Sequence, residues 1–311
     1  MPFSPKKIIP YVQITRPDHW FKNIFVLPGI ALALFLKDTR PNPETILLGL
    51  IVACLTASAN YCINEYLDAE FDKKHPTKYL RPAAQGLVSK YGVIIEYIFL
   101  VTIILFLSLH INITFFLFSL LFLIMGFLYN VPPIRTKDVP YLDVISESIN
   151  NPIRLLLGWS LVLPTVLPPC SFVLAYWSAG AFLMTLKRYD EIKRLHNHET
   201  ILLYRPSLAG YSAEKLLSCA VFYAMNAALF LGIFLIKYKI ELIILFPILA
   251  LLFSWYFSIA QKHNSVAQTP EKLYYERKFV VFVLLLPVIF CILLFVDIPY
   301  LNLLTIPYVV K

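Results

Sequence analysis

Long apolar segments alternate with short polar ones along the chain, and this pattern predicts a membrane protein built of helices. About 20 apolar residues cross a bilayer as an α-helix. Nine segments come near that length. They are Phe21–Leu36, Thr45–Tyr66, Tyr91–Leu109, Ile111–Leu128, Asp143–Val162, Phe172–Tyr189, Ala213–Ile236, Ile240–Ala260 and Phe279–Val296. The sequence therefore predicts an all-α membrane protein, a bundle of about nine transmembrane helices that forms one domain over residues 1–311.

Composition and charge support this class. Hydrophobic residues make up 59% of the chain, charged residues only 15%, and the mean hydropathy is +0.71, which excludes an ordinary soluble protein. If nine helices alternate in direction, 21 of the 27 Lys and Arg residues fall on one side of the membrane. The positive-inside rule makes that side cytoplasmic. The net charge of +8 is thus a signal of topology, and we expect contact with the lipid bilayer and no nucleic-acid partner.

Residues 64–86 read NEYLDAEFDKKHPTKYLRPAAQG and follow the second apolar segment directly. If the helix continues through them, Asn64, Asp68 and Asp72 recur every four residues and share one face. Like charges at this spacing repel each other unless a cation lies between them. Mg²⁺ is typically held by one or two carboxylates and by substrate phosphate oxygens, so these three residues are the predicted metal ligands. The alternative is a solvated helix end, where such charges are ordinary.

Cations that follow the carboxylates favour the first interpretation. Lys73, Lys78 and Arg81 stand close behind Asp72, and basic side chains beside a metal-binding carboxylate are suited to a diphosphate. Lys74 and Lys90 are assigned instead to lipid headgroups at the membrane surface. The pattern predicts a polar active-site chamber that opens to the cytoplasm.

Further polar groups fall at the same predicted membrane face or inside the helices. Glu147, Asn151 and Arg154 share one face of the fifth predicted helix, and ionisable groups inside a membrane helix usually face a cavity or the bundle interior. They either line the substrate cavity or form a structural Glu147–Arg154 pair. The remaining candidates for substrate binding are Lys22, Tyr129, Arg135, Lys137, Lys187, Arg188, Asp190 and Glu191.

The stretch of residues 64–86 resembles the first Asp-rich motif of the UbiA superfamily of intramembrane prenyltransferases. The segments HPTKYLRPAAQG and RPDHWFKN, and less closely KRYDE, resemble one branch in particular, the decaprenyl-phosphate phosphoribosyltransferases. This chain has Glu65 where the pattern usually has Asp. It also has Arg194 where many members that prenylate aromatic compounds have the second Asp of a later motif.

The resemblance implies an Mg²⁺-dependent transferase in a bacterial inner membrane. Its substrates would be a polyprenyl phosphate and phosphoribosyl pyrophosphate, and its catalytic residues Asp68, Asp72, Lys22 and Arg81. An alternative is the transfer of a prenyl group from a polyprenyl diphosphate to an aromatic or other small acceptor. A transporter ranks lower, because the ionisable residues crowd one face of the membrane instead of spreading across its depth.

Overall fold

A computed structural model describes residues 5–37, 41–74, 78–194, 205–262, 265 and 275–304. These residues form α-helices, short 3₁₀ helices and connecting loops, and none of them is in a β-strand, which confirms the all-α class. The chain divides into two compact units. One comprises Met1–Pro168 and Asn197–Tyr211, and the other comprises Pro169–His196 and Ser212–Lys311. The single domain over residues 1–311 stays a prediction.

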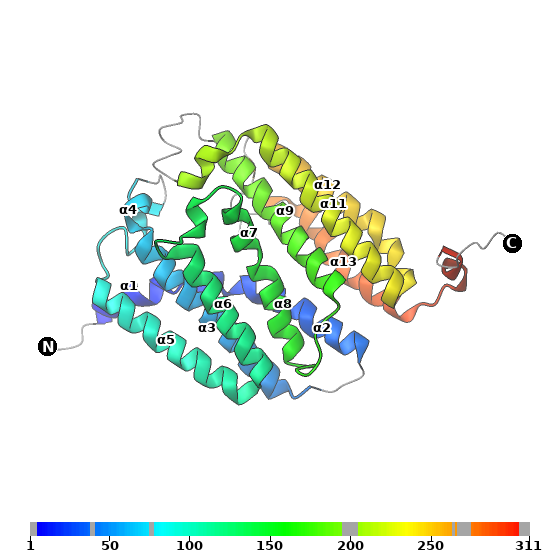
Figure 1. Ribbon diagram of the computed structural model, residues 1–311, viewed down its shortest axis with the longest axis horizontal. Helices are drawn as coiled ribbons and strands as arrows, with labels where there is room; N and C mark the ends of the chain where they lie inside the picture. The colour runs from blue at the N-terminus through cyan, green and yellow to red at the C-terminus, as the bar shows by residue number, and fades with distance from the viewer. Residues whose placement is uncertain are drawn as a thin grey trace. The chain divides into compact units, whose positions relative to one another are not determined.

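Twelve helices make up the described part of the first unit (Figure 1). In chain order they are α1 (Pro5–Ile14), η1 (Pro17–Val26), α2 (Leu27–Leu36), α3 (Pro43–Leu67), α4 (Ala69–Asp72), η2 (Lys78–Leu80), α5 (Lys90–Ile111), α6 (Ile113–Asn130), η3 (Thr136–Asp138), α7 (Leu142–Ser148), α8 (Asn150–Ser160) and η4 (Pro206–Gly210), where η denotes a 3₁₀ helix. Helices α3, α5 and α6 pack on one another, and α8 packs on α2 and α6.

Local sequence sets the ends of these helices. Asn42 caps α3 by accepting a hydrogen bond from the backbone of Glu44. Asn112 ends α5 and also caps α6, where its side chain accepts from the N–H of Phe115 at 2.7 Å. A single extended residue between two long helices makes them antiparallel neighbours. The end of α6 therefore lies beside the start of α5. The ends of α3 and α6 also lie together, because Asn64 of α3 donates a hydrogen bond to Asn130 at the end of α6.

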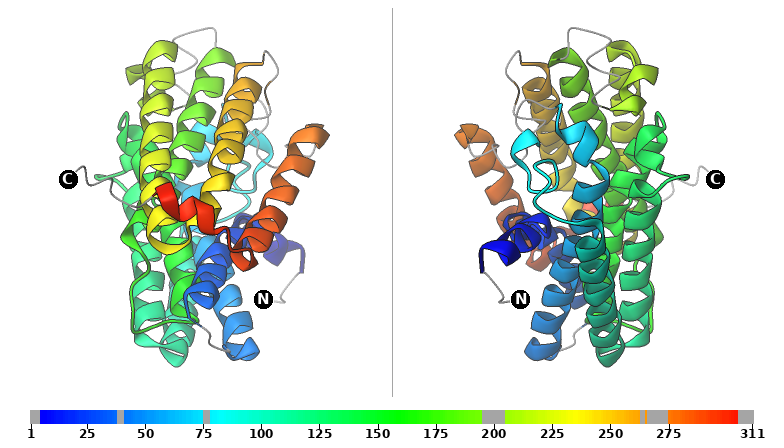
Figure 2. Two further views of the ribbon diagram at one scale, coloured as in Figure 1. Left: turned by 90° about the vertical axis from the view of Figure 1, so that its right-hand side faces the viewer. Right: turned by 90° about the vertical axis from the view of Figure 1, so that its left-hand side faces the viewer.

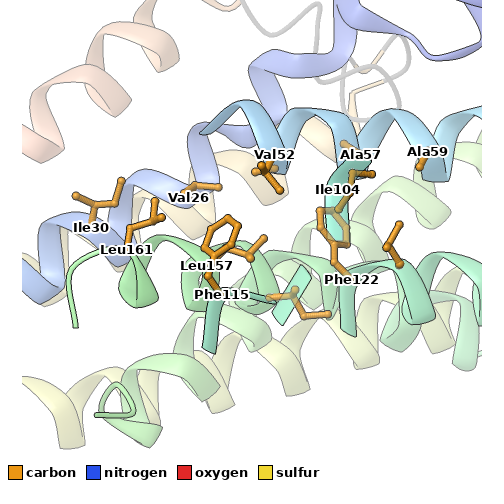
Figure 3. Close-up of a cluster of buried hydrophobic side chains, with 13 residues drawn as sticks. Val26, Ile30, Val52, Ala57, Ala59, Ile104, Phe115, Phe122, Leu157 and Leu161 are labelled. Carbon is orange, nitrogen blue, oxygen red and sulfur yellow. The ribbon is translucent and has the colours of Figure 1, made fainter. Parts of the chain in front are cut away.

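The core of the first unit is formed by side chains from several of these helices (Figure 3). Val26 and Ile30 meet Val52, Phe122 and Leu157 there. Within a membrane, tight packing holds helices together, since lipid is as apolar as these side chains.

Helices α2 and α8 come close enough for backbone contact, because glycine stands at both crossing points. A Cβ atom on Gly29 would lie 2.0 Å from the carbonyl oxygen of Leu155, and one on Gly158 would lie 2.0 Å from that of Val26. Only glycine fits at such points, and small residues are typical of close helix crossings in membranes.

The second unit contains α9 (Cys170–Arg194), α11 (Ala213–Tyr238), η5 (Ile240–Ile244), α12 (Leu245–Gln261), α13 (Arg277–Phe295) and η7 (Pro299–Leu304). Helices α9, α11 and α12 run side by side in both views of Figure 2, and contacts join each pair of them. Phe182, Leu186 and Tyr256 are buried in their shared core.

Seven stretches of the described residues are long and apolar enough to span a membrane: Ile8–Leu36, Pro43–Leu67, Lys90–Ile111, Ile113–Asn130, Cys170–Lys193, Ala213–Tyr238 and Ile240–Gln261. Together with the fold they indicate an integral membrane protein. The number nine stays a prediction.

The fifth predicted helix, Asp143–Val162, is not continuous, because α7 ends at Ser148 and α8 begins at Asn150. Pro152 explains the interruption, since it has no N–H to donate to the carbonyl of Ser148.

Candidate active site

The predicted metal-binding stretch begins where α3 ends. The α-helix is interrupted at Asp68, which has φ −92° and ψ −4°: α3 stops at Leu67, and α4 begins at Ala69. Asp68 N nevertheless donates to Asn64 O at 3.0 Å, and Asp72 N donates to Asp68 O at 2.8 Å. Asn64, Asp68 and Asp72 therefore remain one turn apart along the backbone.

Cations from a later loop neutralise Asp68. Lys137 Nζ lies 2.5 Å and Arg135 Nη2 lies 2.9 Å from its Oδ1 atom, while Asn64 Nδ2 donates to Oδ2 at 3.2 Å. Lys137 lies in η3 and Arg135 immediately precedes it, nearly 70 residues along the chain from Asp68. The sequence indicated that a cation must lie beside these carboxylates, and the protein's own side chains provide positive charge there.

Burial and charge act in opposite directions on the ionisation of this pair. Burial raises the pKa of Asp68, but the charge and hydrogen bond of Lys137 and the charge of Arg135 outweigh it, so the pKa lies below its usual value. Burial is also the largest influence on Lys137, whose pKa falls to about 8 although the Asp68 charge opposes the change. Asp68 is thus an anion at neutral pH.

Asn130 joins this cluster from the end of α6. Its Oδ1 atom accepts from Lys137 Nζ at 2.9 Å and from Asn64 Nδ2, and its own Nδ2 atom donates to Gly126 O at 2.8 Å. Sequence analysis missed Asn130. Its position at the polar end of an apolar helix, just before two prolines, was the available signal.

Asp72 has a different partner. Arg81 Nη1 lies 2.5 Å from its Oδ2 atom, so the guanidinium turns back to this carboxylate. Asp72 is buried, whereas Lys73 is exposed and pairs with the exposed Glu70. Lys78 lies in η2, three residues before Arg81.

A second network connects α6 and α7 to the segment around η4. Tyr129 donates to Glu147 Oε2 at 3.0 Å and accepts from Arg205 Nη2 at 2.6 Å. Arg205 also lies 3.8 Å from the fully buried Asp143 and 3.9 Å from Glu147. The ammonium of Lys137 lies 5.8 Å from the Tyr129 ring centre, which places this network beside the Asp68 cluster. Arg205 was missed, since its loop lies far away in the sequence.

For the other predicted site residues of the first unit, the described contacts join residues other than Asp68. Lys22, in η1, lies 6.0 Å from the ring centre of Tyr61. Arg154, on α8, is buried, donates from Nε to Asn23 Oδ1 at 3.1 Å and lies over the Phe122 ring. Asn151 lies one turn before Arg154, also on α8. The described partners of Glu147 are Tyr129 and Arg205, so both interpretations of the Glu147–Arg154 face stay open.

Four predicted residues lie on α9 in the second unit: Lys187, Arg188, Asp190 and Glu191. Arg188 is fully buried and its Nη1 atom lies 3.1 Å from Glu191 Oε2. This arginine is thus held by a carboxylate of its own helix.

The residues at the end of α3 suit a hard divalent cation in their chemistry. Asp68 and Asp72 offer carboxylate oxygens, and Mg²⁺ in proteins needs only one or two of these when phosphate oxygens complete its shell. No group of three or more His, Cys, Asp or Glu side chains gathers around one point in the described part of the chain. Oxygens of a bound substrate would complete the shell of a metal ion held by Asp68 and Asp72.

A model of the UbiA prenyltransferase family matches residues 25–286. The chain belongs to this family. It is 35% identical over 91 residues to the decaprenyl-phosphate phosphoribosyltransferase of Mycolicibacterium smegmatis, a match that covers 28% of this chain and 29% of that protein. It is 38% identical over 80 residues to the enzyme of the same name from Corynebacterium glutamicum, covering 25% of this chain and 24% of that protein. The matches thus span less than a third of these relatives.

Solved structures show the same fold over nearly the whole chain. A UbiA homologue from Archaeoglobus fulgidus bound to GPP and Mg²⁺ superposes with a TM-score of 0.72 at 19% identity, over 92% of this chain and all of that one. The same homologue bound to DMAPP and Mg²⁺ gives a TM-score of 0.71, also at 19% identity, over 92% of this chain and 99% of that one. At this identity the likeness shows a UbiA fold, and the chain is a UbiA-type membrane transferase.

Proposed function

We propose that this protein transfers a 5-phosphoribosyl group from phosphoribosyl pyrophosphate to a polyprenyl phosphate. The observation that carries the proposal is the pairing of Asp68 with both Lys137 and Arg135. A carboxylate at a helix end with two cations on it offers ligand oxygens for a metal and donors for phosphate oxygens at one place. A reaction between two phosphorylated substrates needs both.

Two further observations favour the phosphoribosyl donor over a prenyl diphosphate. Two relatives that match parts of this chain at 35% and 38% identity are named decaprenyl-phosphate phosphoribosyltransferases. On α9, Lys187 and Arg188 precede Asp190, and the position four residues past Asp190 is Arg194 instead of Asp. Cations on α9 suit a second phosphorylated substrate better than a second metal ion.

The chemistry proposed for the site is a substitution at the anomeric carbon. A phosphate oxygen of the lipid forms a bond to that carbon, while the bond to pyrophosphate breaks and its electron pair leaves with the pyrophosphate. The lipid phosphate is already ionised at neutral pH, so no general base is needed. Lys137, Arg135 and Arg81 would hold phosphate oxygens and stabilise the charge that develops on the leaving group.

Asp68, Asp72 and Asn64 are the proposed ligands of Mg²⁺, which would add positive charge at the leaving pyrophosphate. Lys73 and Lys78 are proposed to bind substrate phosphates, and Tyr129, Glu147, Asn151 and Arg154 to line the substrate chamber. In the second unit, the proposed substrate-binding residues are Lys187, Arg188, Asp190 and Glu191 on α9. Lys22 is proposed to hold the lipid head. We also propose a bacterial inner membrane with these loops on its cytoplasmic side, on the strength of the Lys and Arg distribution.

Prenyl transfer is the second candidate. In that reaction a polyprenyl diphosphate ionises at the same cations and an aromatic or other small acceptor attacks the allylic carbon. The Archaeoglobus fulgidus homologue bound to GPP and Mg²⁺ favours it.

The test is product formation by the purified protein in detergent, with Mg²⁺, polyprenyl phosphate and phosphoribosyl pyrophosphate labelled in the ribose. We expect label in the lipid fraction, and its loss in Asp68→Asn and on addition of EDTA. The matched control is Lys90→Gln, which removes an exposed cation at the start of α5. If no label moves, but a polyprenyl diphosphate alkylates an aromatic acid in the same preparation, prenyl transfer replaces this proposal.

A further inference from the structure

A cavity of about 580 Å³ lies in the first unit between the residues around Arg16 and those around Arg81. Its charged lining consists of Arg16, Asp18, His19, Glu65, Lys78 and Arg81. A volume of this size takes a small ligand. Arg81 also binds Asp72, so the cavity adjoins the end of α3 at the predicted metal-binding stretch.

Glu65 is the unusual group in this cavity. Its side chain is 2% exposed, and its Oε1 atom is buried without a hydrogen-bond partner. A buried acceptor left unsatisfied costs about 1–3 kcal/mol, so such atoms are rare and call for an explanation. The other oxygen, Oε2, accepts from Arg16 Nε at 2.9 Å and from Arg16 Nη2 at 2.8 Å. The ion pair thus fixes the carboxylate and leaves one oxygen able to accept a hydrogen bond from a ligand.

Arg16, which holds Glu65, has an unfavourable backbone conformation. Its φ of 49° and ψ of 62° are left-handed, a region that non-glycine residues seldom occupy, and Pro17 follows it. Residues held in such conformations cost about 1–3 kcal/mol and gather at functional sites. The strained backbone and the two hydrogen bonds from Arg16 to Oε2 together keep the carboxylate in place.

The cations of the cavity select for an anion. Arg16 uses Nε and Nη2 for Glu65, and Arg81 uses Nη1 for Asp72, so both guanidinium groups keep further N–H donors for another acceptor. Lys78 adds an ammonium group, and the carboxylate of Asp18 lies 3.0 Å from His19. A bare anion would be repelled by Glu65, whereas an anion that also carries hydroxyl groups would satisfy Oε1.

We propose that this cavity binds the sugar phosphate end of the donor substrate, with a phosphate monoester on Lys78 and Arg16 and a sugar hydroxyl donating to Glu65 Oε1. The assignment rests on the proposed phosphoribosyl transfer. It places the ribose 5-phosphate in the cavity and leaves the pyrophosphate to Asp68, Asp72 and their cations. It also gives the Glu at position 65 a role in recognising the sugar.

Binding of ribose 5-phosphate and of inorganic phosphate to the purified protein tests this without turnover. We expect ribose 5-phosphate to raise the melting temperature of the wild type more than inorganic phosphate does. Lys78→Gln should weaken ribose 5-phosphate about tenfold or more, the loss expected for a charge-assisted hydrogen bond. Glu65→Gln should weaken ribose 5-phosphate but not inorganic phosphate, and Lys90→Gln should change neither.

Two results would overturn the assignment: equal ribose 5-phosphate affinity in wild type and Lys78→Gln, or a Lys78→Gln defect that appears with polyprenyl phosphate instead. Turnover separates it from the proposed function. If label moves to lipid and Lys78→Gln leaves the KM for phosphoribosyl pyrophosphate unchanged, the cavity assignment fails and the function stands. If no label moves but Lys78→Gln abolishes ribose 5-phosphate binding, the proposed function fails, while the cavity remains a binding site for a sugar phosphate.

Discussion

The ion pair between Asp68 and Lys137 offers the sharpest test of the site, because each partner can be removed separately. Asp68→Asn keeps the shape of the side chain and removes its charge. Lys137 is only 5% exposed. Its ammonium group would then contact two neutral groups, the amide introduced at position 68 and Asn130 Oδ1 at 2.9 Å. Removing one partner of a buried ion pair costs about 3–5 kcal/mol, so we expect the free energy of unfolding to fall by about that amount.

Lys137→Met should cost less, because Asp68 keeps Arg135 at 2.9 Å and Asn64 at 3.2 Å. The loss expected is about 1–3 kcal/mol, that of one hydrogen bond to a charged group. The double variant lacks both charges of the pair, so neither charge is left without its partner. Its loss of unfolding free energy should therefore be smaller than the sum of the two single losses by about 2 kcal/mol, within the range measured for residues in contact.

Equilibrium unfolding in mixed detergent micelles, followed by tryptophan fluorescence, measures all four proteins. The control cycle is Glu70→Gln with Lys73→Met, since that pair is 81% and 50% exposed and should couple by less than about 0.5 kcal/mol. Additive losses at Asp68 and Lys137, within about 0.5 kcal/mol, would refute the reasoning from the buried pair.

The same double variant separates stability from function. It should regain part of the stability lost in Asp68→Asn and still transfer no phosphoribosyl label, because the proposed metal ligand and the proposed phosphate donor are both gone. Full activity in this variant would remove Asp68 and Lys137 from the site.

Three further changes have expected outcomes. The pKa of Asp68 lies below the usual value of about 3.9. The ionised carboxylate therefore stabilises the folded state fully above about pH 4, and this contribution is lost as the pH falls through the lower folded pKa. Asp68→Asn should remove this pH dependence and flatten the acid unfolding curve over that range. Arg188→Met should lower the free energy of unfolding by about 3–5 kcal/mol, since the buried Glu191 loses an ion-pair partner. The double variant Glu191→Gln/Arg188→Met should recover part of this stability. A loss below about 1 kcal/mol in Arg188→Met would contradict the prediction. Gly29→Ala should destabilise the protein by about 1–3 kcal/mol, because its Cβ would lie 2.0 Å from a carbonyl oxygen of α8. The control Gly232→Ala has open space around it and should be neutral or stabilise the protein by up to about 1 kcal/mol. Equal thermal stability of the two variants would refute the packing argument.

The sequence by itself determined the class of this protein and the position of its polar chemistry. Apolar length specifies helices that cross a membrane, because a lipid environment requires each backbone group to be bonded within its own helix. The Asn64–Asp68–Asp72 spacing was also legible, since it depends on residues close together in the chain. The structure divides the fifth predicted helix just before Pro152, and the first and eighth predicted helices each begin with a 3₁₀ helix, η1 and η5.

The tertiary structure decided which charges meet. Asp68 pairs with Lys137 and Arg135 because α3 and α6 end side by side and the loop after α6 returns to the end of α3. Periodicity carries no information about such contacts between distant segments. Glu65 shows the same limit: in the sequence it is a departure from the usual Asp, and only the fold shows it buried against Arg16 in the lining of a cavity, with one oxygen left without a hydrogen bond. The identity of each carboxylate's partner depends on three-dimensional packing, which local spacing does not specify.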